Sequence, residues 1–233
     1  MRGLQNFICL DLETTGLNPK KDRIIEIGAV KVRNGTIIDT FSQLIDPRQT
    51  LEERVEQLTG ISSKELAGKP TIQEILPKLQ EFLGEDVLLG HQILFDYSFL
   101  KRAFTNEKIS FERMGVDTLK LARQFVTDCQ SKKLETLCQH YEIEHQAHRA
   151  LADALATVQL YQKLVENYYK QEDFEPKPLI FKVKKESPIT KAQKERITLL
   201  TAKYNLIPEK EIASMTRNEA SRYMDQIFAT FGR

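Results

Sequence analysis

The sequence has no tryptophan, only three cysteines and no long apolar run. The few cysteines and the lack of a long apolar run each argue against a class of protein. Cys9, Cys129 and Cys138 are an odd number without metal-type spacing, which argues against a disulfide framework and favours a reducing compartment. No stretch approaches the roughly 20 apolar residues that cross a bilayer, and Asp11 and Glu13 interrupt the N-terminal segment before a signal peptide could form. We therefore expect a cytoplasmic protein with no membrane partner.

An excess of one charge is also lacking, because 34 Lys and Arg residues nearly balance 33 Asp and Glu residues. Residues 170–233 hold 13 Lys and Arg against 9 Asp and Glu, for a net charge of +4, whereas residues 1–169 hold 21 against 24, for −3. The 41% hydrophobic content supplies enough apolar surface for a packed core in one or two domains and excludes a wholly disordered chain. Residues 1–169 are net acidic, so they can bind a phosphate substrate only if cations neutralise the repulsion between the acids and the phosphate.

Apolar periodicity predicts an α/β fold. Residues 7–12, 24–32 and 36–45 are β-prone, and the Asn34-Gly35 dipeptide is typical of a hairpin. From residue 51 onward, helical patterns alternate with two short apolar strands. The further predicted strands are 86–90 and 115–118, and the predicted helices are 51–58, 72–83, 95–104, 119–125, 134–141 and 150–169. A meander followed by alternating helices and strands predicts a mixed sheet with helices on its faces.

The C-terminal quarter breaks this rhythm. Residues 171–188 hold three prolines and a lysine cluster, which is typical of a linker. Beyond them, Thr190 to Gln193 and Thr216 to Glu219 are capping-box patterns, and each opens an amphipathic helix. The sequence therefore predicts a first domain over residues 1–170, a linker over 171–188 and a small helical module over 189–233.

Two acids close the first predicted strand. Asp11 and Glu13 are two residues apart, so both carboxylates point to the same face of the strand, next to the apolar Leu10 and Leu12. Like charges beside a core are costly unless cations compensate them. One interpretation is a cation site, and the alternative is a polar strand end that meets solvent.

Two further segments each carry a histidine and an acid. His91 to Asp96 follow the fourth predicted strand, where Asp96 could also simply cap the next helix. His148 and Asp153 open the last long helix of the first domain. If both were helical they would lie about 140° apart around the axis, so His148 must precede the helix if the two are to meet. The alternative is a solvated histidine with an acid that the helix dipole favours. We interpret Asp117 as a helix cap.

Taken together and in this order, these segments resemble the motifs of the DEDDh branch of the RNase H-like 3′→5′ exonucleases. The chain looks most similar to the proofreading epsilon subunits and domains of bacterial replicative DNA polymerases. Residues 11–17, 91–96 and 148–153 match the three motifs, and residues 58–61 match an intermediate segment. The resemblance covers residues 5–168 and departs from the family pattern at Gln92, where asparagine is usual.

The resemblance implies an RNase H-like fold with a mixed five-stranded sheet, and a metal-dependent 3′→5′ exonuclease. Asp11, Glu13, Asp96 and Asp153 would hold two Mg²⁺ or Mn²⁺ ions, with Asp11 bridging both, and His148 would act as general base. The expected substrate is the 3′ end of DNA, single-stranded or frayed, which would release nucleoside 5′-monophosphates in proofreading or repair. A DNA polymerase subunit is an expected partner.

By the same resemblance, Thr14, Thr15, Leu58 and Phe95 contact the 3′-terminal nucleotide, although Leu58 and Phe95 could equally belong to the core. Two other functions stay open, an RNA-directed 3′→5′ exoribonuclease of the same fold and a non-catalytic nucleic-acid-binding or scaffolding module. Oligoribonucleases usually carry methionine where this chain has Thr14, which favours DNA. The sequence leaves open whether residues 189–233 bind single strands, bind a polymerase or only pack on themselves.

Overall fold

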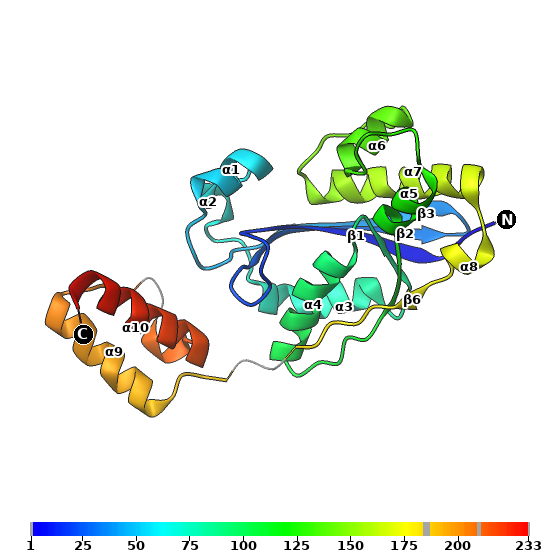
Figure 1. The fold of residues 1–233 in the computed structure, drawn as a ribbon. Coiled ribbons are helices and arrows are strands. Elements are labelled where there is room, and N and C mark those ends of the chain that lie inside the picture. Colours follow the sequence, from blue (N-terminus) through cyan, green and yellow to red (C-terminus); the bar gives the residue numbers. More distant parts are fainter. Residues whose placement is uncertain (1, 184–186, 209–210, 233) are drawn as a thin grey trace. The chain divides into compact units, whose positions relative to one another are not determined.

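The computed structural model describes residues 2–183, 187–208 and 211–232, and the chain forms two compact units, Met1–Val183 and Lys184–Arg233. The larger unit is built on a six-stranded sheet with the order β3-β2-β1-β4-β5-β6 (Figure 1). The strands are β1 (Phe7–Thr14), β2 (Ile24–Arg33), β3 (Thr36–Leu44), β4 (Leu88–Gly90), β5 (Met114–Asp117) and β6 (Lys177–Pro178). Because β1 is antiparallel to β2 and parallel to β4, the sheet is mixed, as predicted.

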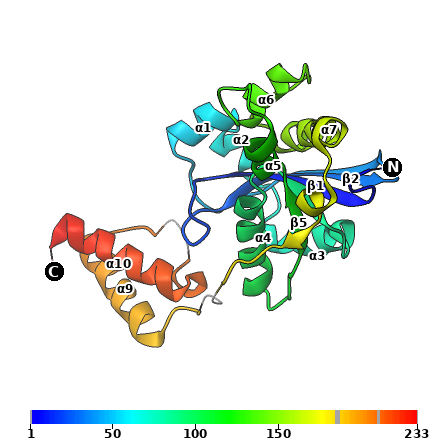
Figure 2. The same cartoon turned by 45° about the vertical axis from the view of Figure 1, so that its right-hand side comes forward.

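Helices cover both faces of this sheet. α5, α6 and α7 lie on one face, and α3 and α4 lie on the other (Figure 1, Figure 2). Their bounds are α3 (Ile72–Leu83), α4 (Leu94–Asn106), α5 (Thr118–Phe125), α6 (Leu134–His140) and α7 (Ala150–Tyr168). Two shorter helices, α1 (Glu53–Thr59) and α2 (Ser63–Leu66), lie between β3 and α3 in the chain. The predicted α/β fold with flanking helices is confirmed.

The alternation of side chains along β1 sorts its residues between two cores. Phe7 and Cys9 are buried in the core beneath α7, whereas the even-numbered residues join the core of α3 and α4. Asp11 and Glu13 share the parity of Phe7 and Cys9. The strand therefore directs both acids to the face that α7 covers.

Gly28 on β2 lets α7 approach the sheet closely. A Cβ atom at this position would lie 2.1 Å from the carbonyl carbon of Ala150, the first residue of α7. Gly28 is paired with Asp11 across β1 and β2, so the start of α7 rests beside that acid. A residue that usually weakens a strand interior here brings a helix end and an acidic strand together.

The segment predicted as a linker belongs partly to the first unit, which corrects the predicted boundaries. α8 (Gln171–Phe174) and β6 both lie within it. Phe174 is 2% exposed, and its ring centroid lies 6.1 Å from that of Tyr161 on α7. β6 pairs with β5 and adds a sixth strand to the five that were predicted. Residues 171–183 thus complete the sheet and its core rather than separating two units.

The second unit contains two main helices with a short connecting helix. They are α9 (Lys191–Tyr204), the 3-10 helix η1 (Ile212–Ser214) and α10 (Arg217–Phe231). The predicted capping boxes at Thr190 and Thr216 are present, and a small core centred on Ile197 holds the unit together. The two predicted helices are therefore confirmed. Across the described residues of both units, the helices are too short or too polar to cross a membrane.

Candidate active site

Asp11 and Glu13 stand at the end of β1, just before an irregularity in its pairing with β2 that leaves Ile25 of β2 without a partner residue. The pairing with β2 changes register between Glu13 and Thr14, an irregularity that redirects a strand. Both acids are half-buried on the face that α7 covers. The strand thus delivers two carboxylates to one point of the sheet.

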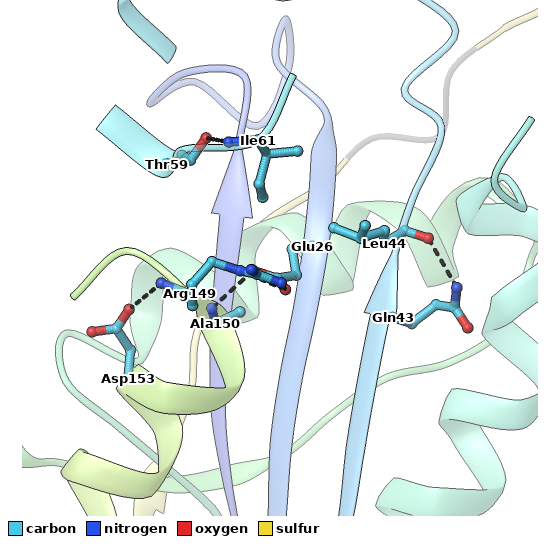
Figure 3. Close-up of polar contacts among 8 residues, drawn as sticks. All are labelled: Glu26, Gln43, Leu44, Thr59, Ile61, Arg149, Ala150 and Asp153. Atoms are coloured by element: carbon cyan, nitrogen blue, oxygen red, sulfur yellow. Dashed lines mark hydrogen bonds and ion pairs between the residues drawn. The ribbon is translucent and has the colours of Figure 1, made fainter. Parts of the chain in front are cut away.

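A third acid, Asp153, comes from the first turn of α7 and is 8% exposed. Its Oδ2 accepts the backbone N–H of Arg149 at 3.1 Å, which fixes the carboxylate at the start of the helix (Figure 3). Carboxylate oxygens of Asp11, Glu13 and Asp153 all lie within 4.8 Å of one another. Three acids from two distant segments therefore form one cluster of oxygen atoms.

The fourth acid, Asp96, reaches this region from the opposite face of the sheet. It lies in the first turn of α4 and is 3% exposed. β4 ends at Gly90, and beyond that end Asp96 Oδ1 accepts the backbone N–H of Leu12 at 3.0 Å. This hydrogen bond holds Asp96 against the backbone that links the first two acids.

All four acids line one open cavity of about 290 Å³, and His148 lines it as well. In the described part of the chain, no Lys or Arg side chain contributes to its wall. The structure therefore brings together the five residues that the sequence analysis named as catalytic, in a space that is strongly acidic.

Burial raises the pKa values of Asp11, Glu13 and Asp96. Desolvation and then the charge of Asp96 hold the pKa of Asp11 well above its usual range. Desolvation and the nearby Asp153 raise the pKa of Glu13 to about 8, although Arg149 opposes that rise. Desolvation also raises the pKa of Asp96. The raised pKa values show that negative charge is crowded here without compensation, which is the charge that a bound cation would neutralise.

Glu26 secures the start of α7, and the sequence analysis did not single it out. It lies on β2 directly opposite Glu13 and is 1% exposed. Its carboxylate accepts Nη2 of Arg149 at 2.9 Å and the backbone N–H of Ala150 at 3.0 Å (Figure 3). An acid inside the otherwise apolar run over residues 24–30 was the available signal. Glu26 thus fixes the helix end on which the third acid depends.

Two histidines precede α7 and have different surroundings. His148 is exposed, has a φ of +66° and lines the cavity from the segment before the helix. His145 Nε2 instead lies 2.5 Å from Oδ1 of Asp153. His145 was not predicted from the sequence, where its signal is a second imidazole three residues ahead of the motif histidine. His145 therefore orients Asp153, while His148 faces the open cavity.

The second motif has a local structural role. His91 is hydrogen-bonded at both ring nitrogens, to Thr118 Oγ1 at 2.9 Å and to the carbonyl of Lys132 at 2.8 Å, and burial lowers its pKa. Gln92 has a φ of +70°, in the left-handed region where asparagine is enriched, which explains the usual asparagine at this position. Asp117 caps α5, as predicted, and also accepts the N–H of Gln92 at 3.0 Å.

The four predicted substrate contacts differ in their surroundings. Phe95 is half-buried and lines the acidic cavity, whereas Leu58 is 55% exposed and lines a second cavity. The hydroxyls of Thr14 and Thr15 hydrogen-bond to backbone groups of the loop after β1, at 2.7 and 3.0 Å. Within the described residues, neither threonine lines the acidic cavity. The exposure of Leu58 argues against the core role that the sequence left open.

Residues 8–161 match the sequence model of the RNase T family, whose description is Exonuclease. The chain belongs to this exonuclease family. Its four acids and His148 all lie within the matched residues. The predicted resemblance is therefore confirmed at the level of the family, and the chain is a nuclease.

Relatives of this exonuclease include components of DNA polymerase III. It is 34% identical over 167 residues to DNA polymerase III subunit epsilon of Aquifex aeolicus. The aligned residues cover 70% of this chain and 82% of that protein. It is 39% identical over 155 residues to a PolC-type DNA polymerase III of Clostridium perfringens. These aligned residues cover 66% of this chain and 11% of that protein. The chain thus spans only a small part of the PolC-type relatives that it matches.

Solved exonucleases share the fold of the first unit. Exonuclease X in complex with 5′ overhanging duplex DNA covers 72% of this chain and 96% of its own, with a TM-score of 0.58 and 23% identity. E. coli exonuclease I in complex with a dT13 oligonucleotide covers 70% of this chain and 41% of its own, with a TM-score of 0.62 and 22% identity. These likenesses assign the fold to the exonucleases.

Proposed function

We propose that this exonuclease hydrolyses phosphodiester bonds at the 3′ end of DNA and releases nucleoside 5′-monophosphates from single-stranded or frayed ends. The observation that carries the proposal is the cavity in which Asp11, Glu13, Asp96 and Asp153 meet beside His148. Family membership supplies the reaction class. The relatives named as DNA polymerase III favour DNA over RNA, and proofreading or repair as the setting.

The acid cluster suits Mg²⁺ or Mn²⁺. Its donors are carboxylate oxygens, which hard divalent cations prefer, and three of them lie within 4.8 Å of one another. The raised pKa values of Asp11 and Glu13 are those expected of buried charges that lack a cation. We infer two ions, which Asp11, Glu13, Asp96 and Asp153 would hold. Bound there, such ions neutralise charge on a phosphate and activate water.

His148 would remove a proton from the attacking water at its imidazole ring. The side chain is exposed and lines the acidic cavity, and imidazole is suited to proton transfer at neutral pH. Its backbone is in the left-handed region, a conformation that a non-glycine residue keeps only where the surrounding structure imposes it. His145 holds the carboxylate of Asp153. In this proposal His145 positions an acid, and His148 transfers the proton.

Phe95 and Leu58 would contact the terminal bases, because each presents apolar surface to a cavity. Stacking on bases tolerates any sequence, so we expect little sequence preference. Thr14 and Thr15 would act through the backbone of their loop, since their hydroxyls already serve that loop.

We also propose a DNA polymerase subunit as a partner and residues 189–233 as a separate accessory module. The epsilon relative is named as a polymerase subunit, and the match to the exonuclease family ends at residue 161, before this module. Co-purification of the full chain with a polymerase, compared with a chain ending at Val183, tests both. A cut within residues 171–178 would remove all or part of β6 and is unsuitable.

The experiment that tests the proposed function uses DNA and RNA oligonucleotides of matched sequence, labelled at either end. With Mg²⁺, we expect mononucleotides from 3′-labelled DNA, a ladder of shortened products from 5′-labelled DNA, and no products in EDTA. Faster turnover of RNA would make this an exoribonuclease. Binding of both nucleic acids without turnover in Mg²⁺ or Mn²⁺ would make it a non-catalytic module.

A further inference from the structure

A second cavity, of about 730 Å³, adjoins the acidic cavity. Five residues line both spaces, His91, Gln92, Leu134, His148 and Asp153, so the two cavities share the wall that carries the proposed base. The acidic cavity, of about 290 Å³, lies just below the range for sites that hold small molecules, about 300–1,000 Å³. A nucleic acid whose last nucleotide enters it must continue outside it.

The two cavities differ in charge. In the described lining of the acidic cavity there is no Lys or Arg. The second cavity is lined by Arg123, Lys132 and Lys133, and Glu135 is its only described acid besides the shared Asp153. Basic side chains therefore begin where the acid cluster ends.

Two of these three cations are available to a ligand. Arg123 on α5 and Lys133 just before α6 are exposed, and neither side chain has an ion-pair or hydrogen-bond partner among the described residues. Lys132 differs, because its Nζ donates to the carbonyl of Cys129. The carbonyl of Lys132 bonds to His91 at 2.8 Å, which ties the loop before α6 to the second motif. Lys133 is thus held at a fixed place relative to the acids.

We propose that Arg123 and Lys133 bind phosphates of the nucleotides that precede the 3′-terminal one and so guide the strand into the acidic cavity. This inference rests on the proposed function, because the strand must end at the acid cluster. The phosphate to be cleaved meets carboxylates and their bound ions, whereas upstream phosphates need cations that the chain itself supplies. The fork of an arginine and the point charge of a lysine both suit phosphate oxygens.

The full chain carrying Arg123→Gln and Lys133→Gln tests this proposal. The substrates are a deoxythymidine 12-mer and the p-nitrophenyl ester of thymidine 5′-monophosphate, which is too short to leave the acidic cavity. The KM of the 12-mer should rise about tenfold, with a much smaller change in kcat. The slope of log KM against log salt should fall by roughly 1.4, because each phosphate contact on a single strand contributes about 0.7. The ester should lose far less kcat/KM than the 12-mer.

A matched control carries Lys69→Gln and Lys163→Gln, two exposed lysines that line neither cavity. An equal loss for the ester and the 12-mer, or an equal loss in this control, overturns the proposal. The anisotropy of a labelled 12-mer in Ca²⁺ measures binding without turnover. The Arg123→Gln, Lys133→Gln chain should bind the 12-mer about tenfold more weakly than the unmodified chain. If the unmodified chain cleaves neither substrate while the binding difference remains, the proposed function fails and the phosphate contacts stand. If neither cleavage nor a binding difference is seen, both are wrong.

Discussion

Glu13 and Glu26 lie directly opposite each other on β1 and β2, yet their surroundings differ. Glu26 is 1% exposed and has its own cation in Arg149, together with the N–H of Ala150. In the described part of the chain, no ion pair neutralises Glu13, and desolvation followed by the charge of Asp153 raises its pKa to about 8. One acid is balanced within the fold, and its neighbour is not.

This difference separates acids that stabilise the fold from those that we propose to be functional. A buried charge that the fold leaves unbalanced lowers stability, so its presence points to a ligand that supplies the missing charge. Asp11 and Asp96 belong with Glu13, because their pKa values are also raised. Glu26 belongs with the framework, because its partners are the residues at the start of α7.

Asp11→Asn should have the largest effect of any single change. We expect kcat to fall by about three orders of magnitude or more, because the cluster loses an acid proposed to hold the ions. The Tm in EDTA should stay the same or rise, since a buried repulsion is removed. Turnover of labelled DNA and thermal melts measure the two quantities. Asp39→Asn, at an exposed acid on β3, is the control. A large loss of Tm in Asp11→Asn would place this acid in the framework.

Substitutions of His148 and His145 should affect different properties. His148→Ala should lower kcat by about two orders of magnitude or more, as loss of a general base does, and keep the rise in Tm that Mn²⁺ causes. His145→Ala should weaken Mn²⁺ binding by about tenfold or more, because Asp153 loses the partner that orients it. Full activity in His148→Ala would remove that residue from the mechanism.

Glu26→Ala should act mainly on stability. It leaves the buried N–H of Ala150 and the guanidinium of Arg149 without their partner, which we expect to cost about 2 kcal/mol. For a chain of this size that lowers Tm by roughly 4–8 °C. Glu26→Gln should lose less, since an amide oxygen can still accept the N–H of Ala150. The comparison between Glu13 and Glu26 is wrong if Glu26→Gln abolishes turnover without changing Tm.

The pH dependence of stability tests the raised pKa of Glu13 without any substitution. In EDTA, the folded protein holds a proton on Glu13 up to about pH 8, whereas the unfolded chain releases it near pH 4.3. The folded state therefore binds more protons between these values, and its stability falls as pH rises from about 4.5 to about 8. Mg²⁺ should reduce the fall, because the cation replaces the proton. Melts across this range measure it, and a Tm that rises with pH in EDTA contradicts the raised pKa.

The parts of the fold that could be predicted from the sequence have local signals. Alternation along residues 7–13 was enough to place Asp11 and Glu13 on one face of a strand, and Asp117 was recognised as a cap from its position before a helix. Helix ends were also predicted within a few residues, because capping patterns such as that at Thr190 mark them.

The parts that could not be predicted depend on contacts between distant segments. The bond from Glu26 to Arg149 joins β2 to the start of α7, and nothing near either residue encodes the other. β6 has only two residues, one of them Pro178, so its composition resembled a linker until its pairing with β5 was known. His145 likewise contacts Asp153 only because of the path that the chain takes before α7.

Titration of Mn²⁺ into the metal-free full chain, followed by calorimetry in two buffers of different ionisation enthalpy, tests the central claim most directly. We predict saturable binding with release of protons near neutral pH, because Glu13 has a pKa of about 8 and must lose its proton to bind a cation. Binding should be lost in Asp11→Asn and kept in Glu26→Gln. Equal binding by the unmodified chain and Asp11→Asn, or no saturable binding by the unmodified chain, would contradict a cation site at these acids.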